Sequence, residues 1–593
     1  MKFSKLNTRA PLSHSNAARY QMSQQMWALR ALLYVGAELV SARLFPAVRT
    51  YKREVYTRCV NSDLDLLPAL KRYWGYESFR PLQERIVRSL LGGRDVCVVM
   101  PTGGGKSLCY QLPAALSEKT AVVISPLIAL MQDQVAQLTQ MGIAAAVLNS
   151  SISAREQSTI MRNAASGQYR LLYLSPERLA RADTAEWLRT LPISFFAIDE
   201  AHCISEWGHE FRPEYRMLSR LREQFPECPI AAFTASATYR VRHDIIAQLK
   251  LRESDNYIAS FYRPNLRYLV KQCDARTQPE MLLRAVQKHS EGNLIVYSPT
   301  IARVGETVEF LEEHGIEAVP YHGRMDADER RRNQERWMCN EVRVLVGTLA
   351  FGLGINKEAV RAVIHLSLPK SVEQFYQEAG RAGRDGEPAN CILLWQKRDV
   401  GLLTHFIGEI ADPAEKERAW QRYHEIRRFV DSTGCRHRQI CGHFGEKTKW
   451  ESCEACDVCG CDLDWLTEAP QAARHEARRE SLRASDAPPQ RSPKSRKAEK
   501  APIAADIDLD LREFLREWRR TTAKRQLVPA YVVMHDSSLD DLCRKLPSSL
   551  AALRHVSGFG ERKTELYGPD ILEALAEFRK KGRAADRAHG SNV

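Results

Sequence analysis

The stretch Asp95-Val-Cys-Val-Val-Met-Pro-Thr-Gly-Gly-Gly-Lys-Ser107 decides the fold of the region around it. Its first six residues form a short β-rich run, its glycines predict a turn, and an apolar helical stretch follows. A strand, a glycine-rich turn and a helix in this order direct backbone N–H groups and a helix N-terminus toward one position, where phosphate groups bind. The segment therefore predicts a nucleotide-phosphate site in an α/β protein.

Side chains of this segment have individual predicted roles. Lys106 is expected to neutralise the β- and γ-phosphates of ATP, and the Ser107 hydroxyl is expected to help hold Mg²⁺. The surrounding backbone comes from Thr102, Gly103, Gly104 and Gly105. The strict template has glycine at position 100, where this chain has Met100, so a turn with a purely structural use is the alternative.

Two further segments complete the predicted site. Asp199-Glu-Ala-His202 follows a hydrophobic strand, at the edge where α/β sheets present ligands. Asp199 is expected to bind the Mg²⁺ shell, and Glu200 to orient and deprotonate the attacking water. In Gln377-Glu-Ala-Gly-Arg-Ala-Gly-Arg384, Arg381 and Arg384 are expected on one helical face, from which they could reach γ-phosphate oxygens. A solvated turn and a basic surface helix are the alternatives for these two segments.

Short strands alternate with helical stretches on both sides of the glycine-rich turn, as in a parallel sheet. Residues 121–125 and 195–199 read as further strands of one sheet, and residues 294–297, 342–347 and 362–365 as strands of a second. At 593 residues the chain is too long for one hydrophobic core. The fold class is therefore α/β with two parallel-sheet lobes in tandem, followed by smaller helical parts.

The predicted division of the chain follows composition and periodicity. Leu511, Phe514, Leu515 and Trp518 have helical spacing, whereas the preceding Ala-, Arg-, Pro- and Ser-rich stretch has almost no apolar periodicity. The predicted parts are a basic N-terminal extension (1–60), an ATP-binding lobe (61–270), a second lobe (271–425), a metal-binding module (426–463), a flexible basic linker (464–505), a helical domain (506–580) and a tail (581–593).

Charge and cysteine content narrow the class of protein. The 86 Lys and Arg residues exceed the 73 Asp and Glu residues by 13, a surplus that suits a polyanionic partner, although solubility alone would also explain it. Fifteen cysteines without a secretory signal indicate a reducing compartment. The most apolar stretch near the N-terminus, residues 27–45, contains three charged residues, so we expect no membrane span.

Four cysteines predict a structural metal site. Cys453, Cys456 and Cys459 have the tight spacing of thiolate ligands, and Cys435 lies 18 positions before Cys453. Four soft ligands can close a tetrahedron around Zn²⁺ and fold a segment that is too short for its own core. Cys441 and Cys461 are also close in sequence, so spacing alone leaves the choice of ligands open.

These motifs together resemble the RecQ helicases of helicase superfamily 2, over about residues 60–460 and again in the last domain. The resemblance implies two RecA-like motor lobes. It also implies that Gln83, assisted by Arg80, reads the adenine edge in Phe79-Arg-Pro-Leu-Gln83. Thr234 and Ser236, in Phe233-Thr-Ala-Ser-Ala237, would couple hydrolysis to movement along DNA, Gln377 would contact the nucleotide, and Arg381 and Arg384 would be arginine fingers. Further matching segments are Ser125-Pro-Leu127, Ser175-Pro-Glu-Arg178, Tyr321-His-Gly323 and Thr348-Leu-Ala-Phe-Gly-Leu-Gly-Ile-Asn356.

The resemblance extends to the DNA contact and to the zinc ligands. The segment Cys203–Arg212 resembles the aromatic-rich loop that links strand binding to hydrolysis, and it contains Trp207, His209, Phe211 and Arg212. Aromatic faces stack on bases without sequence preference and Arg adds a phosphate contact, whereas a packed interior cluster is the alternative for the two large rings. Cys435 precedes an Arg-rich turn as the first zinc ligand does in RecQ proteins, which favours it over Cys441.

The chain also departs from its family. RecQ proteins commonly have a winged-helix domain after the zinc module, but here only about 45 residues separate Cys461 from the final domain, so we expect the winged helix to be absent. The final domain resembles an HRDC domain, an auxiliary DNA binder in this family. Its turn at Val556-Ser-Gly-Phe-Gly-Glu-Arg-Lys563 could hold a phosphate backbone through Arg562 and Lys563, or could serve helix packing alone.

The predicted function is an ATP-dependent DNA helicase that uses ATP, Mg²⁺ and Zn²⁺. By resemblance it moves 3′ to 5′ and unwinds 3′-tailed duplexes and junctions in recombination, repair and replication. It would act as a monomer in a bacterial cytoplasm or nucleoid, with single-strand-binding protein or recombination factors as possible partners. The alternatives are a DNA-stimulated translocase with weak unwinding, an ATP-gated binding module and an RNA-directed motor.

Overall fold

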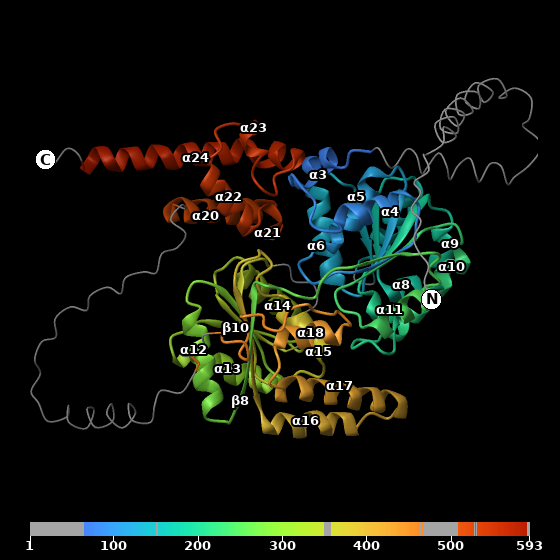
Figure 1. The fold of residues 1–593 in the computed structure, drawn as a ribbon. Coiled ribbons are helices and arrows are strands. Elements are labelled where there is room, and N and C mark those ends of the chain that lie inside the picture. The colour runs from blue at the N-terminus through green and yellow to red at the C-terminus, as the bar shows by residue number, and fades with distance from the viewer. Residues whose placement is uncertain are drawn as a thin grey trace, which may run out of the picture. The chain divides into compact units, whose positions relative to one another are not determined.

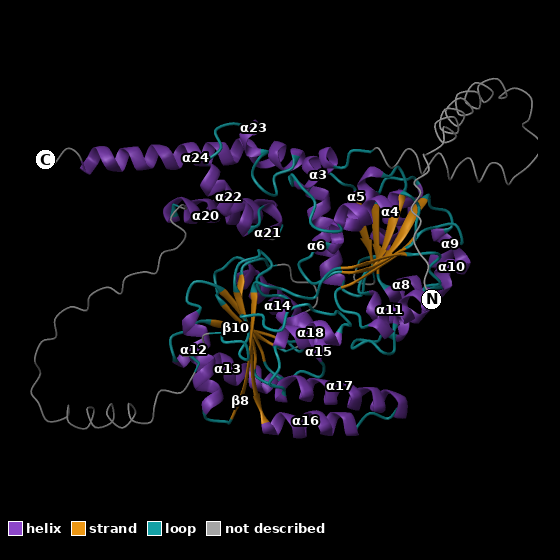
Figure 2. Ribbon diagram, in the orientation of Figure 1, coloured by secondary structure: helices purple, strands orange, loops and turns teal. Residues whose placement is uncertain are grey.

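The computed structural model describes residues 64–149, 152–348, 357–461, 465–466, 508–526, 528 and 530–589. Its two largest parts are parallel β-sheets with helices packed on them (Figure 1). Figure 2 shows the strands gathered into two separate groups. The predicted class of two parallel-sheet lobes followed by smaller helical parts is therefore confirmed.

The first sheet has seven strands in the order β3-β4-β2-β5-β6-β1-β7, and every pairing is parallel. Its strands are β1 (Val96–Val99), β2 (Thr120–Ile124), β3 (Ala145–Leu148), β4 (Leu171–Leu174), β5 (Ile193–Ile198), β6 (Ile230–Thr234) and β7 (Asp255–Ile258). Its helices are α3 (Leu67–Trp74), α4 (Gln83–Leu91), α5 (Lys106–Leu116), α6 (Ile128–Gln140), α7 (Ala154–Ala165), α8 (Pro176–Leu179), α9 (Ala182–Leu188), η1 (Ala201–Ile204), η2 (Pro213–Arg220), α10 (Leu221–Gln224) and α11 (Tyr239–Gln248).

Strand β1 explains why the apolar run that precedes the glycine-rich turn does not alternate with polar residues. Val96 and Val98 lie in one buried cluster, whereas Cys97 and Val99 lie in another on the opposite face. Because successive side chains of a strand point to opposite faces, a strand covered on both sides must be apolar at every position.

The second sheet has six strands in the order β10-β11-β9-β12-β13-β8, again all parallel. Its strands are β8 (Leu266–Cys273), β9 (Asn293–Tyr297), β10 (Ala318–Tyr321), β11 (Val344–Gly347), β12 (Val360–His365) and β13 (Ala389–Gln396). Its helices are α12 (Thr277–Lys288), α13 (Ile301–Glu313), α14 (Ala327–Met338) and α15 (Val372–Ala379). This sheet begins five residues before the expected boundary at residue 271, because β8 pairs with β13 from Leu266 onward.

A helical module follows the second sheet and contains α16 (Lys397–Gly408), α17 (Pro413–Asp431) and α18 (Arg436–His443). The final domain contains α20 (Leu509–Gln526), α21 (Ala530–Val533), α22 (Asp536–Lys545), α23 (Leu550–Leu553) and α24 (Glu561–His589). Leu511 and Leu515 on α20 are buried in the core of this domain, and Phe514 and Trp518 pack against it, as their spacing predicts. The predicted linker spans residues 464–505, and most of it lies outside the described residues. The expected absence of a winged helix therefore stays a prediction.

The topology brings three sequence motifs to one edge of the first sheet. Strands β5, β6 and β1 are neighbours and parallel. Their carboxyl ends lead into the acidic motif at Asp199, the segment that contains Ser236, and the glycine-rich turn. Ligands of open α/β sheets bind at this edge, so the fold places these motifs as a nucleotide site requires.

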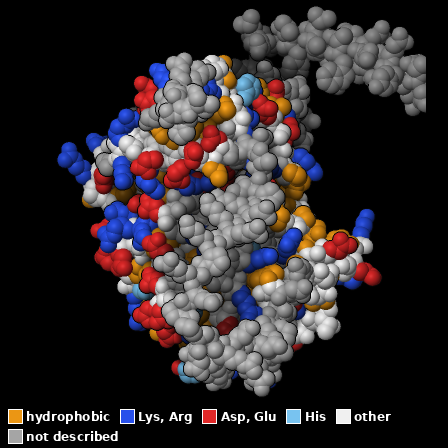
Figure 3. All heavy atoms as spheres, turned by 90° about the vertical axis from the view of Figure 1, so that its left-hand side faces the viewer, with side chains coloured by type: hydrophobic (Ala, Val, Ile, Leu, Met, Phe, Trp, Pro, Cys, Tyr) orange, Lys and Arg blue, Asp and Glu red, His pale blue; other side chains and the backbone are white. Residues whose placement is uncertain are grey.

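The surface shown in Figure 3 has Lys and Arg side chains mixed with Asp and Glu side chains. Among the described residues, no helix combines the length and apolar character needed to cross a membrane.

Candidate ATP site, cysteine cluster and aromatic loop

The glycine-rich turn opens helix α5, with Lys106 as its first helical residue and Gly105 as its N-cap at φ +81°. The left-handed backbone conformation favours glycine here, and a Cβ atom would also displace the Gln83 amide, whose Nε2 would lie 2.3 Å away. Gln83 Nε2 donates to the carbonyl of Gly105 at 3.2 Å, and the backbone N–H of Arg80 donates to Gln83 Oε1 at 2.8 Å. Gln83 and Arg80, predicted to read adenine, therefore lie against the phosphate turn.

The Lys106 ammonium group lies within the turn. Its Nζ donates to the carbonyls of Met100 at 3.1 Å and Pro101 at 3.5 Å. Burial lowers the pKa of Lys106, whereas the nearby carboxylates of Glu200 and Asp199 act to raise it. A cation kept beside two acids and partly removed from water is suited to a phosphate ligand.

Asp199 and Glu200 follow strand β5 directly. Burial and the adjacent charge of Glu200 raise the pKa of Asp199, whose Oδ2 accepts a hydrogen bond from Ser125 Oγ at 3.4 Å. Burial acts to raise the pKa of Glu200 as well, but its contact with His202 holds that pKa below the ordinary value. The surroundings therefore shift the two pKa values in opposite directions, and Glu200 is the carboxyl group that stays ionised more readily.

A polar network leads from the acidic motif to the second lobe. His202 Nδ1 lies 3.3 Å from Glu200 Oε2 and 3.0 Å from Thr234 Oγ1. The backbone N–H of Ser236 donates to Thr234 Oγ1, and Ser236 Oγ accepts a hydrogen bond from Gln377 Nε2 at 2.8 Å. Thr234 and Ser236 are buried, so their position fits coupling between the lobes rather than direct contact with DNA.

Arg381 and Arg384 lie beyond helix α15, and the expectation that one helix carries both is wrong. The helix ends at Ala379, and the next residues form a turn in which Gly383 has φ +55°. That left-handed residue redirects the chain, so the arginines are placed by the turn and not by helical periodicity. The turn still faces the first lobe, because a Cβ atom on Gly103 would lie 3.2 Å from Cγ of Arg384. Burial and the neighbouring Arg381 lower the pKa of Arg384 to about 9.

The sequence prediction missed Arg263, which joins the two halves of the site. Its guanidinium donates to the carbonyl of Thr102 in the glycine-rich turn at 3.2 Å, and to those of Ala382 at 3.1 Å and Gly383 at 2.8 Å. Asn265 donates to the same Gly383 carbonyl at 2.8 Å. An isolated arginine in the connection between two sheets gives no periodic signal, so only its spatial neighbours identify it.

Gln134, on helix α6, was also missed. Its Nε2 donates to Ser107 Oγ at 3.1 Å, and its Oε1 accepts hydrogen bonds from Tyr110 at 3.0 Å and Tyr173 at 2.8 Å. The two phenols fix the orientation of the Gln134 amide, which in turn orients the hydroxyl predicted to hold Mg²⁺. The sequence did offer one signal for this residue, because Gln134 is a polar residue on a helix that packs against an apolar core.

The loop predicted to contact DNA is partly packed in this conformation. Two guanidinium groups lie over the Trp207 ring, that of Arg240 at 3.0 Å from its centroid and that of Arg418 at 5.6 Å. His209 stacks on His202 with ring centroids 4.6 Å apart. Phe211 and Arg212 are half-buried, and Arg216 lies 5.2 Å from the Phe211 ring. The loop thus contacts the ATP motif through His209 and the helical module through Trp207.

A cleft beside this loop is lined by residues of three parts of the chain. His209 and Glu210 come from the loop, Gln377 and Arg381 from the second lobe, and Phe406 from helix α16. The Phe406 side chain is exposed. The cleft therefore joins the loop to one of the predicted arginine fingers.

Four cysteines form a compact cluster at the end of the helical module. The Sγ atoms of Cys435, Cys453, Cys456 and Cys459 all lie within 4.8 Å of one another. A tetrahedral Zn²⁺ site with Zn–S bonds of about 2.3 Å needs sulfur atoms about 3.8 Å apart, so the donor set and its size fit zinc. Cys441 and Cys461 lie outside this group.

Family models match the described parts in sequence order. The DEAD/DEAH box helicase model matches residues 80–245, and the helicase conserved C-terminal domain model matches residues 277–386. The RecQ zinc-binding model matches residues 397–460, and the HRDC domain model matches residues 508–575. The two lobes therefore have the fold class of a helicase motor, and the cysteine cluster lies in a zinc-binding module.

Comparison with individual proteins narrows the class of helicase further. The chain is 41% identical over 394 residues to the ATP-dependent DNA helicase RecQ of Haemophilus influenzae, covering 66% of this chain and 63% of that protein. It is 36% identical over 424 residues to the putative ATP-dependent DNA helicase Q1 of Caenorhabditis briggsae, covering 70% and 67%. It is 36% identical over 392 residues to the putative ATP-dependent RNA helicase R290 of Acanthamoeba polyphaga mimivirus, covering 66% and 71%.

The chain belongs to the RecQ family of helicases. The predicted resemblance is confirmed for the two lobes, the zinc-binding module and the HRDC domain. The match spans 63% and 62% of the lengths of the Haemophilus influenzae and Pasteurella multocida RecQ proteins.

Proposed function

We propose that this chain is an ATP-dependent DNA helicase that moves 3′ to 5′ on single-stranded DNA and unwinds 3′-tailed duplexes and junctions. The observation that carries the proposal is one site assembled from both lobes. Lys106 and Glu200 come from the first lobe, and Arg384 of the second lobe packs against the glycine-rich turn. Hydrolysis that depends on residues of two lobes changes with their separation, which is how a motor couples ATP to movement.

Each residue has a role in hydrolysis that follows from its position. Lys106 and the backbone N–H groups of the turn hold the phosphates, and Glu200 accepts a proton from the attacking water. Arg381 and Arg384 stabilise negative charge that develops on the γ-phosphate. Buried Arg381 Nε has no protein hydrogen-bond partner in the described part of the chain, which leaves it available for such a ligand.

The proposed cofactors fit the residues present. Ser107 and Asp199 would hold Mg²⁺ with hard oxygen donors, and the ion would neutralise phosphate charge. Cys435, Cys453, Cys456 and Cys459 would hold a structural Zn²⁺ in a closed site.

The proposed nucleic-acid contact is the aromatic loop with its adjoining cleft. Trp207 must separate from Arg240 and Arg418 before a base can take the place of their guanidinium groups on its ring. Since His209 stacks on His202, movement of this loop reaches the contact between His202 and Glu200 directly. DNA binding would therefore alter the group that activates water. We further propose that the chain acts as a monomer in the cytoplasm or nucleoid of a bacterium and serves recombination, repair and replication.

The deciding experiment measures ATP turnover with and without single-stranded DNA, beside strand release from a duplex with a 3′ overhang. We expect strong stimulation and release, no release from the matching 5′-tailed duplex, and loss of both activities in Lys106→Ala. RNA of equal length and sequence is the control for the nucleic acid.

The outcomes separate the candidate functions. Stimulation by DNA without strand release would replace unwinding by translocation alone. Equal stimulation by RNA would overturn the assignment to DNA. Turnover that neither nucleic acid changes would overturn the proposal of a nucleic-acid motor.

A further inference from the structure

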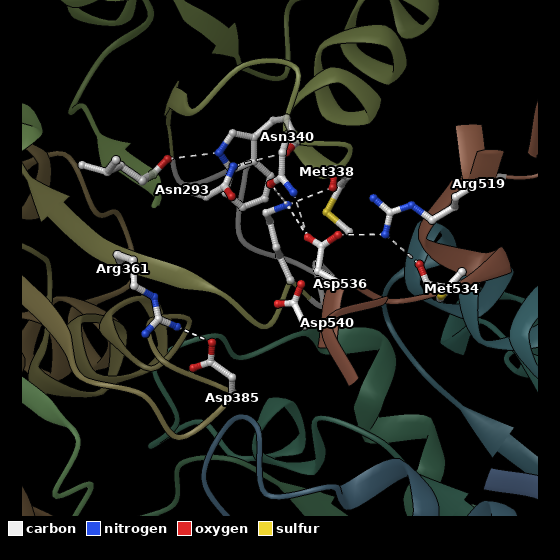
Figure 4. Close-up of polar contacts among 12 residues, drawn as sticks. Asn293, Met338, Asn340, Arg361, Asp385, Arg519, Met534, Asp536 and Asp540 are labelled. Atoms are coloured by element: carbon white, nitrogen blue, oxygen red, sulfur yellow. Dashed lines mark hydrogen bonds and ion pairs between the residues drawn. The ribbon is translucent and has the colours of Figure 1, made fainter. Parts of the chain in front are cut away.

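The HRDC domain contacts both motor lobes through residues at its buried surface. On the second lobe, Asn340 Nδ2 donates to Asp536 Oδ2 at 2.9 Å (Figure 4). Lys357 Nζ lies 3.7 Å from the same oxygen. Within the domain, Arg519 donates to Asp536 Oδ1 at 2.8 Å and to the Met534 carbonyl at 2.9 Å. Asp536 is therefore shared between the domain and the lobe.

This junction is a buried charge network and not a surface ion pair. Lys357 and Arg519 are 5% and 2% exposed, and Lys357 also donates to the carbonyl of Met338 at 2.8 Å and to Asn340 Oδ1 at 2.6 Å. Although burial acts to raise it, the charges of Arg519 and Lys357 hold the pKa of Asp536 below its ordinary value. A buried pair with satisfied hydrogen bonds is costly to break on one side only.

The same domain reaches the first lobe by different contacts. Tyr531 donates to Asp133 Oδ1 on helix α6 at 2.8 Å, and Arg72 on helix α3 pairs with Glu561 at 3.0 Å. A Cβ atom on Gly560 would lie 2.5 Å from the carbonyl oxygen of Arg72, so the two backbones are in close contact. Tyr531 and Val532 belong to the main buried cluster of the motor.

Both anchor points are adjacent to the ATP site. On the first lobe, Asp133 precedes Gln134, which holds Ser107. On the second lobe, Lys357 precedes Glu358, whose carbonyl accepts the backbone N–H of Arg384 at 3.1 Å. On each lobe, the residue that contacts the HRDC domain is therefore the sequence neighbour of a residue that contacts the ATP site.

We propose that the HRDC domain is a clamp whose binding partner is the motor itself, and that it restrains separation of the two lobes. Lys563, one of the two basic residues expected at a DNA phosphate, is buried and donates to the Val532 carbonyl at 3.1 Å. Arg384 packs against the glycine-rich turn and Arg263 donates to it, so both lobes close over the site in the clamped arrangement and we expect ATP and ADP to pass faster when the lobes separate. Detachment of the clamp from one lobe should therefore speed the release of nucleotide.

The first lobe is the side that detaches. Its polar anchors are one hydrogen bond from Tyr531 and two exposed ion pairs, Arg72 with Glu561 and His555 with Glu77. The second-lobe junction is a buried network of several hydrogen bonds around Asp536. Exposed pairs contribute little to association, whereas buried charged hydrogen bonds contribute more.

Two conservative variants of the full-length chain test the clamp. Tyr531→Phe removes the hydroxyl that reaches the first lobe, and Asn340→Gly removes the amide on the second while suiting the left-handed backbone at φ 60°. Both leave Arg519 paired with Asp536 and the apolar core of the domain intact. Asp570→Asn removes an exposed ion pair of the same domain that contacts neither lobe, and it is the matched control.

Hydrogen exchange measures clamping directly, and release of a fluorescent ADP analogue measures its consequence. We expect faster exchange in α6 for Tyr531→Phe and in residues 338–347 for Asn340→Gly. ADP release should be about fivefold faster or more in both variants, with the control unchanged. Asp133→Ala, which removes the acceptor, combined with Tyr531→Phe should be no worse than either single variant, because both lose the same bond.

Unchanged exchange and unchanged ADP release in both variants would overturn the clamp. The effect on nucleotide release rests on the proposed ATPase function, but hydrogen exchange does not. A chain that fails to hydrolyse ATP would therefore refute the proposed function while the exchange data still decide whether the domain is clamped.

Discussion

Glu200 has a backbone conformation that few residues of its type adopt. Its φ of 47° lies in the left-handed region, directly after a buried parallel strand. The turn brings its carboxylate within 3.3 Å of His202 Nδ1, which lies within hydrogen-bond distance of the side chain of Thr234. A strained residue that surrounding contacts hold in place is consistent with a group positioned for chemistry rather than for stability.

Replacement of Glu200 by Gln tests its role as the base for hydrolysis. We expect kcat for ATP to fall by about 10² to 10⁴, because an amide cannot accept the proton from water. Binding of ATP, measured with a fluorescent analogue, should change little since the phosphate contacts remain. Glu227→Gln, an exposed acid on the same lobe, is the control. Equal turnover by Glu200→Gln and the control would remove Glu200 from the mechanism.

At the scale of elements, the cysteine cluster adjoins the main hydrophobic core, which contains Cys435 and Cys456. Strand β8 is joined to this segment by hydrogen bonds between Tyr268 and the backbone of Ala455 and Asp457. Arg436 pairs with Asp457 across the cluster at 2.9 Å. These contacts connect helix α18 and the cysteines to the second sheet, so loss of the metal should loosen the module where it adjoins the motor.

Metal analysis and proteolysis test the predicted zinc site. We expect one Zn²⁺ per chain, and loss of that metal in Cys456→Ser because a closed thiolate site needs all four ligands. Protease cleavage within residues 432–461 should increase in the variant. Cys228→Ser changes a cysteine outside the cluster and should keep the metal. Full metal content in Cys456→Ser would contradict the assigned ligand set.

A buried ion pair between α15 and α18 predicts a pH dependence of stability. His443 Nε2 lies 2.7 Å from Glu373 Oε1, and His443 Nδ1 lies 3.6 Å from Glu425. Burial acts to lower the pKa of His443, but the charge of Glu373 raises it overall; despite burial, His443 lowers the pKa of Glu373 to about 2. The stabilisation is therefore present between the unfolded pKa values of the two groups, about 4.3 for Glu and 6.5 for His.

This stabilisation is lost as pH rises through the raised pKa of His443, or falls toward 2. Urea unfolding of the wild type and His443→Gln should differ by about 1.5 to 3 kcal/mol near pH 6, and by progressively less at higher pH. His405→Gln, on α16, is the control. A difference that stays constant from pH 6 to 9 would exclude ionised His443 as its source.

At the scale of the whole molecule, Arg263 joins three parts of the chain. Its side chain bridges the glycine-rich turn and the arginine turn, while its carbonyl lies 3.1 Å from His437 Nε2 in the zinc-binding module. A change in one lobe therefore reaches the other through a single side chain. Gln377, which binds Ser236, is a second polar link across the same interface.

Arg263→Lys tests whether this bridge sets the geometry of the closed site. Lysine keeps the charge but cannot reach carbonyls on both lobes at once. We expect kcat for DNA-stimulated hydrolysis to fall about tenfold or more with little change in the KM for ATP, because the arginine turn is misplaced while the phosphate turn is intact. Arg267→Lys on strand β8 is the exposed control. A rise in KM alone would assign Arg263 to nucleotide binding.

The sequence by itself determined the parts of this protein that are continuous along the chain. The glycine-rich turn, the acidic motif after β5 and the cysteine spacing depend on residues that are neighbours in sequence, and fixed local geometry brings their side chains together. Burial of both faces of the sheets also made their strands readable as apolar runs. The relative position of the motifs then followed from parallel topology.

Only the tertiary structure decided the contacts between distant segments. Arg263 with Thr102, Gln134 with Ser107, and Tyr531 with Asp133 join residues that no periodicity relates. The arginine turn was misread as helix because its spacing suits a helix, while Gly383 enforces a turn that packs against the first lobe. Such contacts depend on how whole lobes pack, and packing reflects the summed shape and charge of surfaces rather than any local pattern.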